Sequence, residues 1–239
     1  MPEPDSPHSA AESRRVAELV SALRTEVEAT ISPDSPLMSE TFVDEFQSRL
    51  LTQHVFIGTP LFQEGFDRAI IASAAAAGFD VAEAPGGQRF WDLSLNGRKV
   101  SLKSSKAKNL MPHKLHISKL TEAAWIQDCR TAAKRQRATL NLFETYCSEV
   151  DEILQLRYFA RSATYELVGV PVRLLEQILD LPTSEFQADG PTINIPVGKT
   201  PPDFTLKIDR SDAKITLANI LKANCIVHGA WVLPPPATP

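Results

Sequence analysis

Cysteine is scarce in this sequence, which has three cysteines among 239 residues, at Cys129, Cys147 and Cys225. An odd number of widely spaced cysteines fits neither a disulfide framework nor a zinc site. We therefore expect all three to be reduced residues that pack against their neighbours.

Long apolar segments are missing as well. No run approaches the roughly 20 residues that cross a bilayer, and the opening MPEPDSPHSAAESRR contains no apolar secretory segment. These absences predict a cytoplasmic protein with no membrane partner. The composition, 43% hydrophobic and 23% charged, is that of a globular chain with one sizeable core.

Acidic residues are absent between Asp92 and Glu122, although the net charge of the whole chain is only -4. The interval is basic instead, and its cationic or titratable residues are Arg98, Lys99, Lys103, Lys106, Lys108, His113, Lys114, His116 and Lys119. A solvated surface is the simplest interpretation of one basic run. Because this run begins at the candidate site described next, we favour an anion-binding role.

The dipeptide Asn96-Gly97 predicts a two-residue type I′ turn between two short strands. This turn sets the register, so that Asp92 lies opposite Ser101, and Lys103 follows two residues later on the same face. The other face is apolar and carries Trp91, Leu93, Leu95, Val100 and Leu102. We therefore expect a carboxylate, a hydroxyl and an amine to meet beside a core wall.

Periodicity predicts an α/β fold, with a mixed central β-sheet flanked by helices and an additional C-terminal β-rich part. We expect helices over 16–31, from Ser39 past Leu50, from Pro60 to Gly78, and from 120 or 121 to about 147 with a break near Thr131. Strands are expected over 79–83, in the 89–105 hairpin, at 115–117, over 153–159 and over 165–170. A helix is expected at 172–179, and the chain after it is expected to be mostly β.

The predicted organisation is one domain, 13–234, between a disordered tail at 1–12 and a second tail at 235–239. Within the domain we expect a helical part at 13–59, a catalytic core at 60–150 and a β-rich part at 151–234 that is a candidate for DNA recognition.

A carboxylate and a lysine on a rigid strand pair suit phosphodiester hydrolysis. The carboxylate holds a divalent metal, which activates a water, and the lysine stabilises that water or the developing charge. Mg²⁺ suits such a site because it takes oxygen ligands and keeps waters. A second acidic ligand is needed, and Glu64, in the first turn of the third helix, is the best candidate.

These residues resemble the PD-(D/E)xK nuclease superfamily, which includes most type II restriction endonucleases. The resemblance rests on a helix bearing Glu64, a strand bearing Asp92, and a strand ending in Ser101-Leu102-Lys103, which looks like the family's (D/E)xK element. It covers Pro60 to Cys147. Trp91 replaces the family's proline, and Ser101 stands where the family usually has an acid.

The resemblance implies a Mg²⁺-dependent endonuclease that cuts double-stranded DNA at a short specific sequence, with catalytic residues Glu64, Asp92, Ser101 and Lys103. Metal would be held by Asp92 and Glu64, with Glu122 or Glu83 as other possible acid donors. Some family members with SxK recruit their acid from a neighbouring helix. Cutting both strands of a symmetric site implies a homodimer, for which the helices before Pro60 are candidates.

Further basic residues are candidates for DNA contact. The expected phosphate contacts are Lys106, Lys108, Lys114, Lys119, Arg130, Lys134 and Arg137, although a solvated helical face explains the last three equally well. If the protein reads bases, the candidates are Arg210 and Lys207 or Lys214. Alternative functions are a repair or recombination nuclease of the same fold, a non-catalytic DNA-binding module, and an unrelated interaction protein.

Overall fold

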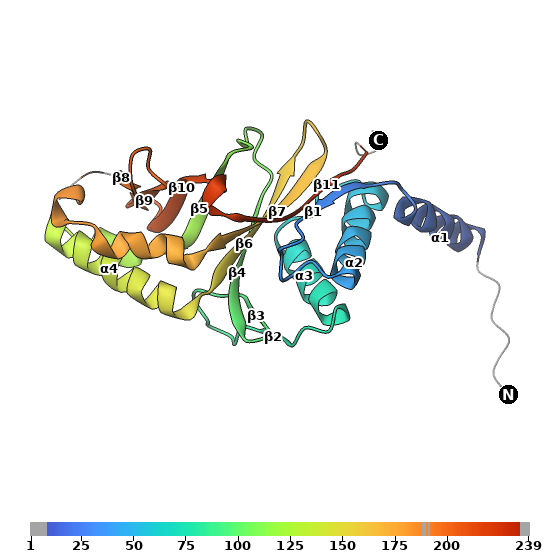
Figure 1. Cartoon of the computed structure of the whole chain (residues 1–239), viewed down its shortest axis with the longest axis horizontal. Coiled ribbons are helices and arrows are strands. Elements are labelled where there is room, and N and C mark those ends of the chain that lie inside the picture. Colours follow the sequence, from blue (N-terminus) through green and yellow to red (C-terminus); the bar gives the residue numbers. More distant parts are fainter. Residues whose placement is uncertain (1–8, 188–189, 191, 235–239) are drawn as a thin grey trace.

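The chain folds around two β-sheets (Figure 1). The computed structural model describes residues 9–187, 190 and 192–234. The larger sheet has seven strands in the order β1-β11-β7-β6-β4-β3-β2, and the smaller has four in the order β5-β10-β9-β8. In the larger sheet β4 and β6 are parallel and the other neighbours are antiparallel, so the sheet is mixed.

The bounds of the elements are as follows. The α-helices are α1 (Ala10–Leu23), α2 (Glu40–Leu51), α3 (Glu64–Ala76) and α4 (Ala132–Glu149). The strands of the larger sheet are β1 (Glu28–Ile31), β2 (Val81–Glu83), β3 (Leu93–Leu95), β4 (Arg98–Ser105), β6 (Glu152–Phe159), β7 (Thr164–Pro171) and β11 (Ile226–Val232). Those of the smaller sheet are β5 (Lys114–Glu122), β8 (Thr192–Val197), β9 (Phe204–Asp209) and β10 (Lys214–Leu221).

Two hydrophobic cores lie on opposite faces of the larger sheet. One core joins α2 and α3 to alternate residues of the central strands, such as Val100, Leu102 and Leu154. The other joins α4, the 3₁₀ segment Val172–Asp180 and the inner face of the smaller sheet. Helices therefore flank the mixed sheet as the sequence predicts, and Figure 1 shows α4 beside the smaller sheet and α2 with α3 beside the larger one.

The predicted hairpin is present. Asn96 and Gly97 have φ of +50° and +80°, the conformation that a type I′ turn requires at both central residues. Leu93 pairs with Val100 and Leu95 with Arg98, which is the predicted register. The strand expected over 153–159 is β6, the one over 165–170 is β7, and α3 ends before Gly78 as predicted.

Two predictions about the N-terminal part were wrong. The first helix begins at Ala10, where Ser9 and Glu12 form a capping box, so 10–12 are helical rather than part of a disordered tail; 1–8 lie outside the described residues. It also ends at Leu23, because the residues up to Ile31 pair as β1 with β11. Gly229, opposite Ile31, leaves the space that this side chain occupies. The predicted helical part at 13–59 therefore includes a strand.

The long helix expected from 120 or 121 also differs. Residues up to Glu122 belong to β5, which pairs with β10 through Ile215 and Lys214. A 3₁₀ turn, Ala124–Gln127, follows, and α4 begins after Thr131, which caps it. Two register shifts in the β5–β10 pairing break the alternation, which explains why the strand's apolar residues resemble a helical pattern.

Candidate active site

Asp92 lies immediately before β3 and is held by the backbone of β4. Its Oδ2 accepts the N–H of Leu102 at 2.5 Å and the hydroxyl of Ser101 at 3.3 Å. The ammonium of Lys103 donates to Ser101 Oγ at 2.9 Å and lies 3.8 Å from Asp92 Oδ2. The turn therefore brings Asp92, Ser101 and Lys103 together, and we refer to these three residues as the hairpin face.

Ser101 is enclosed rather than open to solvent. It is fully buried, and the hydroxyl of Tyr146 on α4 lies near it, although in the described part of the chain no group completes a well-formed hydrogen bond to that hydroxyl. Burial raises the pKa of Tyr146, and the negative charge of Asp92 adds to this effect. A carboxylate in place of Ser101 would thus enter a closed environment, which gives a physical reason for a neutral residue there.

The first turn of α3 lies against the end of β4. The backbone N–H of Gln63 donates to Ser104 Oγ at 2.8 Å, and the Lys106 ammonium lies 3.8 Å from the centre of the Phe62 ring. Gln63 has a positive φ of +53°, a conformation that costs free energy in a residue with a side chain. The contact with Ser104 accompanies this backbone geometry and sets α3 beside Lys103.

Asp67 is the acid of α3 that is coupled to the hairpin face. Burial raises its pKa to about 6, with further increases from the negative charges of Asp92 and Glu64 and a decrease from Lys103. The reciprocal effect is present at Lys103, whose pKa is lowered by burial but supported by Asp92 and Asp67. Asp67 and Asp92 therefore lie within electrostatic range of each other and of Lys103.

The other acids considered from the sequence lie differently. Glu64 is exposed in the same first turn as Asp67 and adds to the negative potential there. Glu83 forms an exposed ion pair with Arg68 at 3.0 Å. Glu122 binds Lys119 at 2.7 Å, and this hydrogen bond lowers its pKa.

Sequence reasoning did not single out Asp67. The available signal was its position next to Phe66, because Phe66 and Ile70 are the large apolar residues among the buried ones of α3. An acid beside such a buried stripe lies at the edge of the packed face, where it can approach the sheet.

Basic residues surround a pocket that continues from Lys103. This pocket, of about 330 Å³, lies between β4 and β5, and its lining includes Lys103, His116, Ser118, Lys119 and Gln155. Lys119 acts on Lys103 electrostatically. Of the predicted phosphate contacts, Lys119 is therefore near the hairpin face, while Lys106, Lys108 and Lys114 belong to the β4–β5 loop or its end.

The buried guanidinium of Arg157 fixes this basic loop. It donates to the carbonyl oxygens of Met111 and Lys114 and pairs with Glu166 at 2.6 Å. Lys222 also binds Glu166, at 2.6 Å. The loop carrying Lys106 and Lys108 is thus tied at its C-terminal end to the central sheet.

Arg130, Lys134 and Arg137 lie farther away. Lys134 and Arg137 are exposed on α4, and Arg130 precedes the helix. Lys134 is twelve residues before Tyr146, or about 18 Å along the helix axis. Contact between these residues and DNA would therefore be several nucleotides from the hairpin face.

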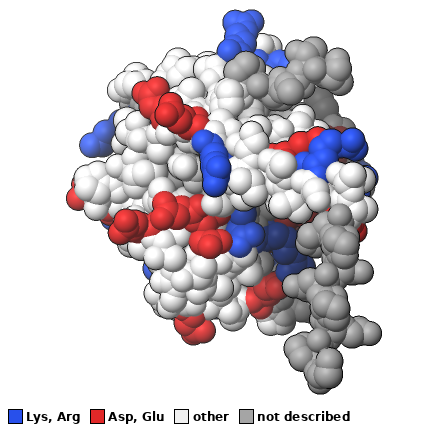
Figure 2. Space-filling view, turned by 90° about the vertical axis from the view of Figure 1, so that its right-hand side faces the viewer, with Lys and Arg blue, Asp and Glu red and all other residues white. Residues whose placement is uncertain are grey.

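The end of the molecule that carries α1 differs from the basic pocket. Figure 2 faces this end and shows acidic and basic side chains scattered among uncharged ones. No single basic surface is visible on that side.

The donor set has a bearing on metal binding. No cluster of three or more His, Cys, Asp or Glu side chains suited to a metal occurs among the described residues. Mg²⁺ does not need such a cluster, because it is commonly held by one or two carboxylates together with waters and substrate phosphate oxygens. Asp67 and Asp92 match that requirement.

The mixed sheet, its flanking helices and the carboxylate–lysine hairpin define a restriction-endonuclease-like nuclease. The family model of SmaI, described as type II site-specific deoxyribonuclease, matches residues 11–233. The chain belongs to this family, and it is accordingly a site-specific DNA endonuclease. The assignment favours the restriction-enzyme interpretation over the alternatives drawn from the sequence.

The comparisons also identify individual similar proteins. The type II restriction enzyme SmaI of Serratia marcescens is 27% identical over an alignment of 231 residues, and the match covers 88% of this chain and 88% of SmaI. A solved structure, a restriction endonuclease in complex with substrate DNA, aligns with a TM-score of 0.37 and 14% identity over 77% of this chain and 78% of its own. No helix in the described ranges is long and apolar enough to span a membrane.

Proposed function

We propose that this enzyme hydrolyses phosphodiester bonds of double-stranded DNA with Mg²⁺, using Asp92 and Asp67 as metal ligands and Lys103 as the catalytic cation. The observation that carries the proposal is the closeness of Lys103 to Asp92, 3.8 Å between Nζ and Oδ2, beside a second acid whose pKa responds to both. The family assignment supplies the reaction class.

The residues of the hairpin face have distinct roles in this scheme. When bound, Mg²⁺ would polarise the phosphate and lower the pKa of a coordinated water. Asp92 offers a carboxylate oxygen in an orientation fixed by Leu102 N–H. Lys103 donates to the attacking water or to the developing charge on phosphate, and Ser101 holds its ammonium in place.

Glu64 has an indirect role in attracting the metal ion. It lies three residues before Asp67 in the same turn, so it raises the local negative potential that attracts a cation. We assign the direct ligand position to Asp67, because Asp67 is the acid of α3 that acts on Lys103.

The assembly we propose is a homodimer that acts in the cytoplasm, where it meets DNA. A two-fold dimer is the simplest arrangement for cutting both strands of a symmetric site. α1 supports the proposal of an N-terminal interface, because Val16, Val20 and Leu23 are exposed on it and the helix extends from the body next to α2 (Figure 1).

The test is digestion of a long DNA of known sequence with Mg²⁺ by wild type, Asp92→Ala and Lys103→Ala. We expect discrete fragments from wild type and none from either variant, with DNA binding retained in both. Arg161→Ala, at an exposed turn between β6 and β7, is the matched control and should cut normally. Undiminished cutting by both site variants would remove the assignment of these residues.

A further inference from the structure

The outer face of β8 and β9 in the smaller sheet carries side chains that are exposed or half-buried. Along β8 and β9 the buried residues alternate with Asn194 and Pro196 on one strand and Thr205 and Lys207 on the other. The buried set, which consists of Ile193, Ile195, Val197, Phe204, Leu206 and Ile208, belongs to the core beneath. Since side chains alternate in a strand, the polar set points to the opposite side.

These polar residues form a row across the sheet. Asn194 is directly opposite Lys207, and Lys207 is directly opposite Thr216 on β10. Thr216 donates its hydroxyl to the carbonyl of Ser118 on β5 at 2.7 Å. We call Asn194, Lys207 and Thr216 the polar row.

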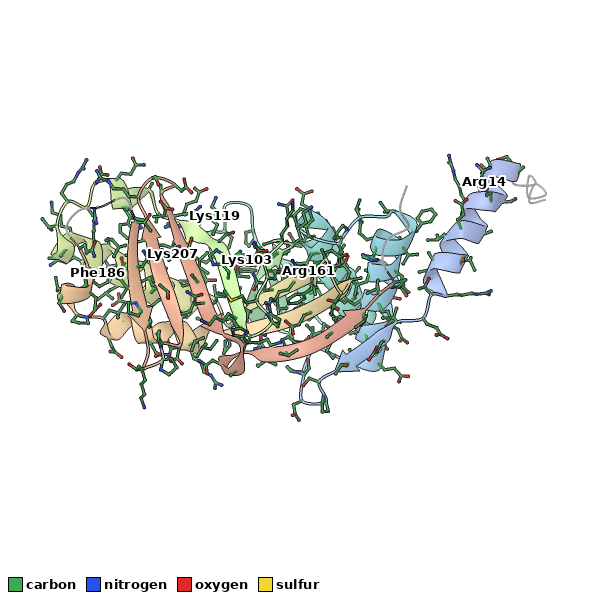
Figure 3. All side chains as sticks on the ribbon, turned by 90° about the horizontal axis from the view of Figure 1, so that it is seen from above. Arg14, Lys103, Lys119, Arg161, Phe186 and Lys207 are labelled. Atoms are coloured by element: carbon green, nitrogen blue, oxygen red, sulfur yellow. The ribbon has the colours of Figure 1, made fainter. Side chains whose placement is uncertain are left out.

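The polar row continues into the candidate active site. Ser118 and Lys119 line the pocket that Lys103 also lines. Figure 3 shows Lys207, Lys119 and Lys103 in this order along the molecule, on β9, β5 and β4. A ligand extended over the hairpin face in this direction therefore meets the polar row next.

The charge of this face suits a polyanion. Burial lowers the pKa of His116, and the positive charges of Lys207 and Lys214 lower it further, which shows that both lysines act on the pocket. Lys214 forms an ion pair with Asp212, whereas no acid pairs with Lys207 in the described part of the chain. Asp209, the acid at the end of β9, accepts the hydroxyl and N–H of Ser211 within its own hairpin.

We propose that the outer face of β8 and β9 reads base edges in the major groove, with Asn194 and Lys207 as specificity-determining residues. The inference rests on the proposed function and deepens it. The major groove admits two antiparallel strands side by side, and β8 and β9 are the two strands at the β8 edge of the four-stranded sheet, where β8 ends the strand order.

The chemistry of the two residues assigns the bases. An asparagine amide donates to and accepts from the adenine edge, and a lysine donates to O6 and N7 of guanine. Lys207 therefore requires a guanine in the recognition sequence. Asn194, its cross-strand neighbour, contacts an adjacent base pair.

The experiment uses the full chain and a duplex library with a randomised segment. The library is digested in Mg²⁺ by wild type, Lys207→Ala and Asn194→Ala, and the cut ends are sequenced to give the base preference at each position. Equilibrium binding to the preferred duplex and to single-base variants of it is measured in Ca²⁺. Lys119→Ala is the matched lysine control, because a phosphate contact carries no sequence information.

For each variant of the polar row we expect relaxed preference at one base position per half-site, with discrimination there reduced about 10- to 100-fold. Lys119→Ala should weaken binding to all duplexes alike and keep the wild-type preference. We expect all the variants to have the Tm of the wild type, since these side chains lie outside the core.

Two results would overturn the inference in different ways. Cutting by wild type at a defined sequence, with the same discrimination in Lys207→Ala and Asn194→Ala, would show that another surface reads the bases while the proposed function stands. Absence of cutting and of DNA binding by wild type would overturn the proposed function and, with it, this inference.

Discussion

The backbone N–H of Leu102 donates to Oδ2 of Asp92 at 2.5 Å, so the carboxylate before β3 is held by the backbone of β4. Leu102 lies between the two other residues of the hairpin face, and its own side chain is buried in the core shared with α2 and α3. The packing of that core thereby fixes the orientation of Asp92. Preorganisation of this kind is what electrostatic catalysis requires.

Removal of the Ser101 hydroxyl tests the positioning of Lys103. Ser101→Ala deletes the acceptor that lies 2.9 Å from the ammonium. Hydrogen bonds to charged groups contribute about 1.5–3 kcal/mol, so we expect kcat for DNA cleavage to fall by about ten-fold or more, with KM little changed. Single-turnover cleavage measures the effect.

Ser94→Ala supplies the control for this prediction, because Ser94 lies in β3 of the same hairpin, closer to the turn. It should retain wild-type cleavage. Equal losses in both serine variants would point to a general disturbance of the hairpin instead of a specific contact.

Asp67 and Glu64 can be separated by isosteric substitution. We expect Asp67→Asn to reduce cleavage by about 100-fold or more, because a metal ligand stabilises the transition state by several kcal/mol. Glu64→Gln, three residues earlier and exposed, should reduce it by less than about ten-fold, the size of a screened surface effect. Cleavage rates over a Mg²⁺ titration distinguish the two, and a larger loss in Glu64→Gln would transfer the ligand role to Glu64.

The pH dependence of cleavage follows from the same acid. Its pKa of about 6 means that Asp67 is protonated, and cannot bind a cation, below this pH. Cleavage at low Mg²⁺ should therefore fall as pH decreases through about 6. Because metal and proton compete for one carboxylate, higher Mg²⁺ should move the midpoint to lower pH. A midpoint that does not respond to Mg²⁺ would contradict this origin.

The parts of this site that the sequence predicts depend on residues that are close together in the chain. Asn96-Gly97 determines the turn, the turn determines the register, and the register brings Asp92 toward Ser101 and Lys103. Each of these steps involves neighbours in the chain. The same holds for the caps at Ser39 and Thr131, which fix the starts of α2 and α4.

The parts that the sequence does not reveal depend on contacts between distant segments. β1 is a strand because β11 lies beside it, about two hundred positions away in the sequence. Whether Glu64 or Asp67 faces the hairpin face depends on the orientation of α3 about its own axis at the end of β4. The hydrogen bond between Gln63 and Ser104, 41 positions apart in the sequence, helps to set this orientation. Periodicity within either segment contains no information on that rotation.

Ionised Asp67 should also lower the stability of the fold, because it is partly buried and lies near the negative charge of Asp92. Its pKa is raised from 3.8 to about 6 on folding, so the folded chain holds this proton more tightly than the unfolded chain does. The resulting contribution to stability is fully present below pH 4 and is lost as pH rises through about 6. Asp67→Asn removes the charge and should be more stable than wild type at pH 8. Because Asp67 is partly exposed, we expect a gain of about 1 kcal/mol, or about 2–4 °C in Tm.

Thermal unfolding without metal at pH 8 and pH 4 measures this gain in stability, with Glu64→Gln as the matched exposed control. The gain should vanish at pH 4. A lower Tm for Asp67→Asn at pH 8 would mean that the surroundings stabilise the ionised carboxylate, which would contradict the raised pKa.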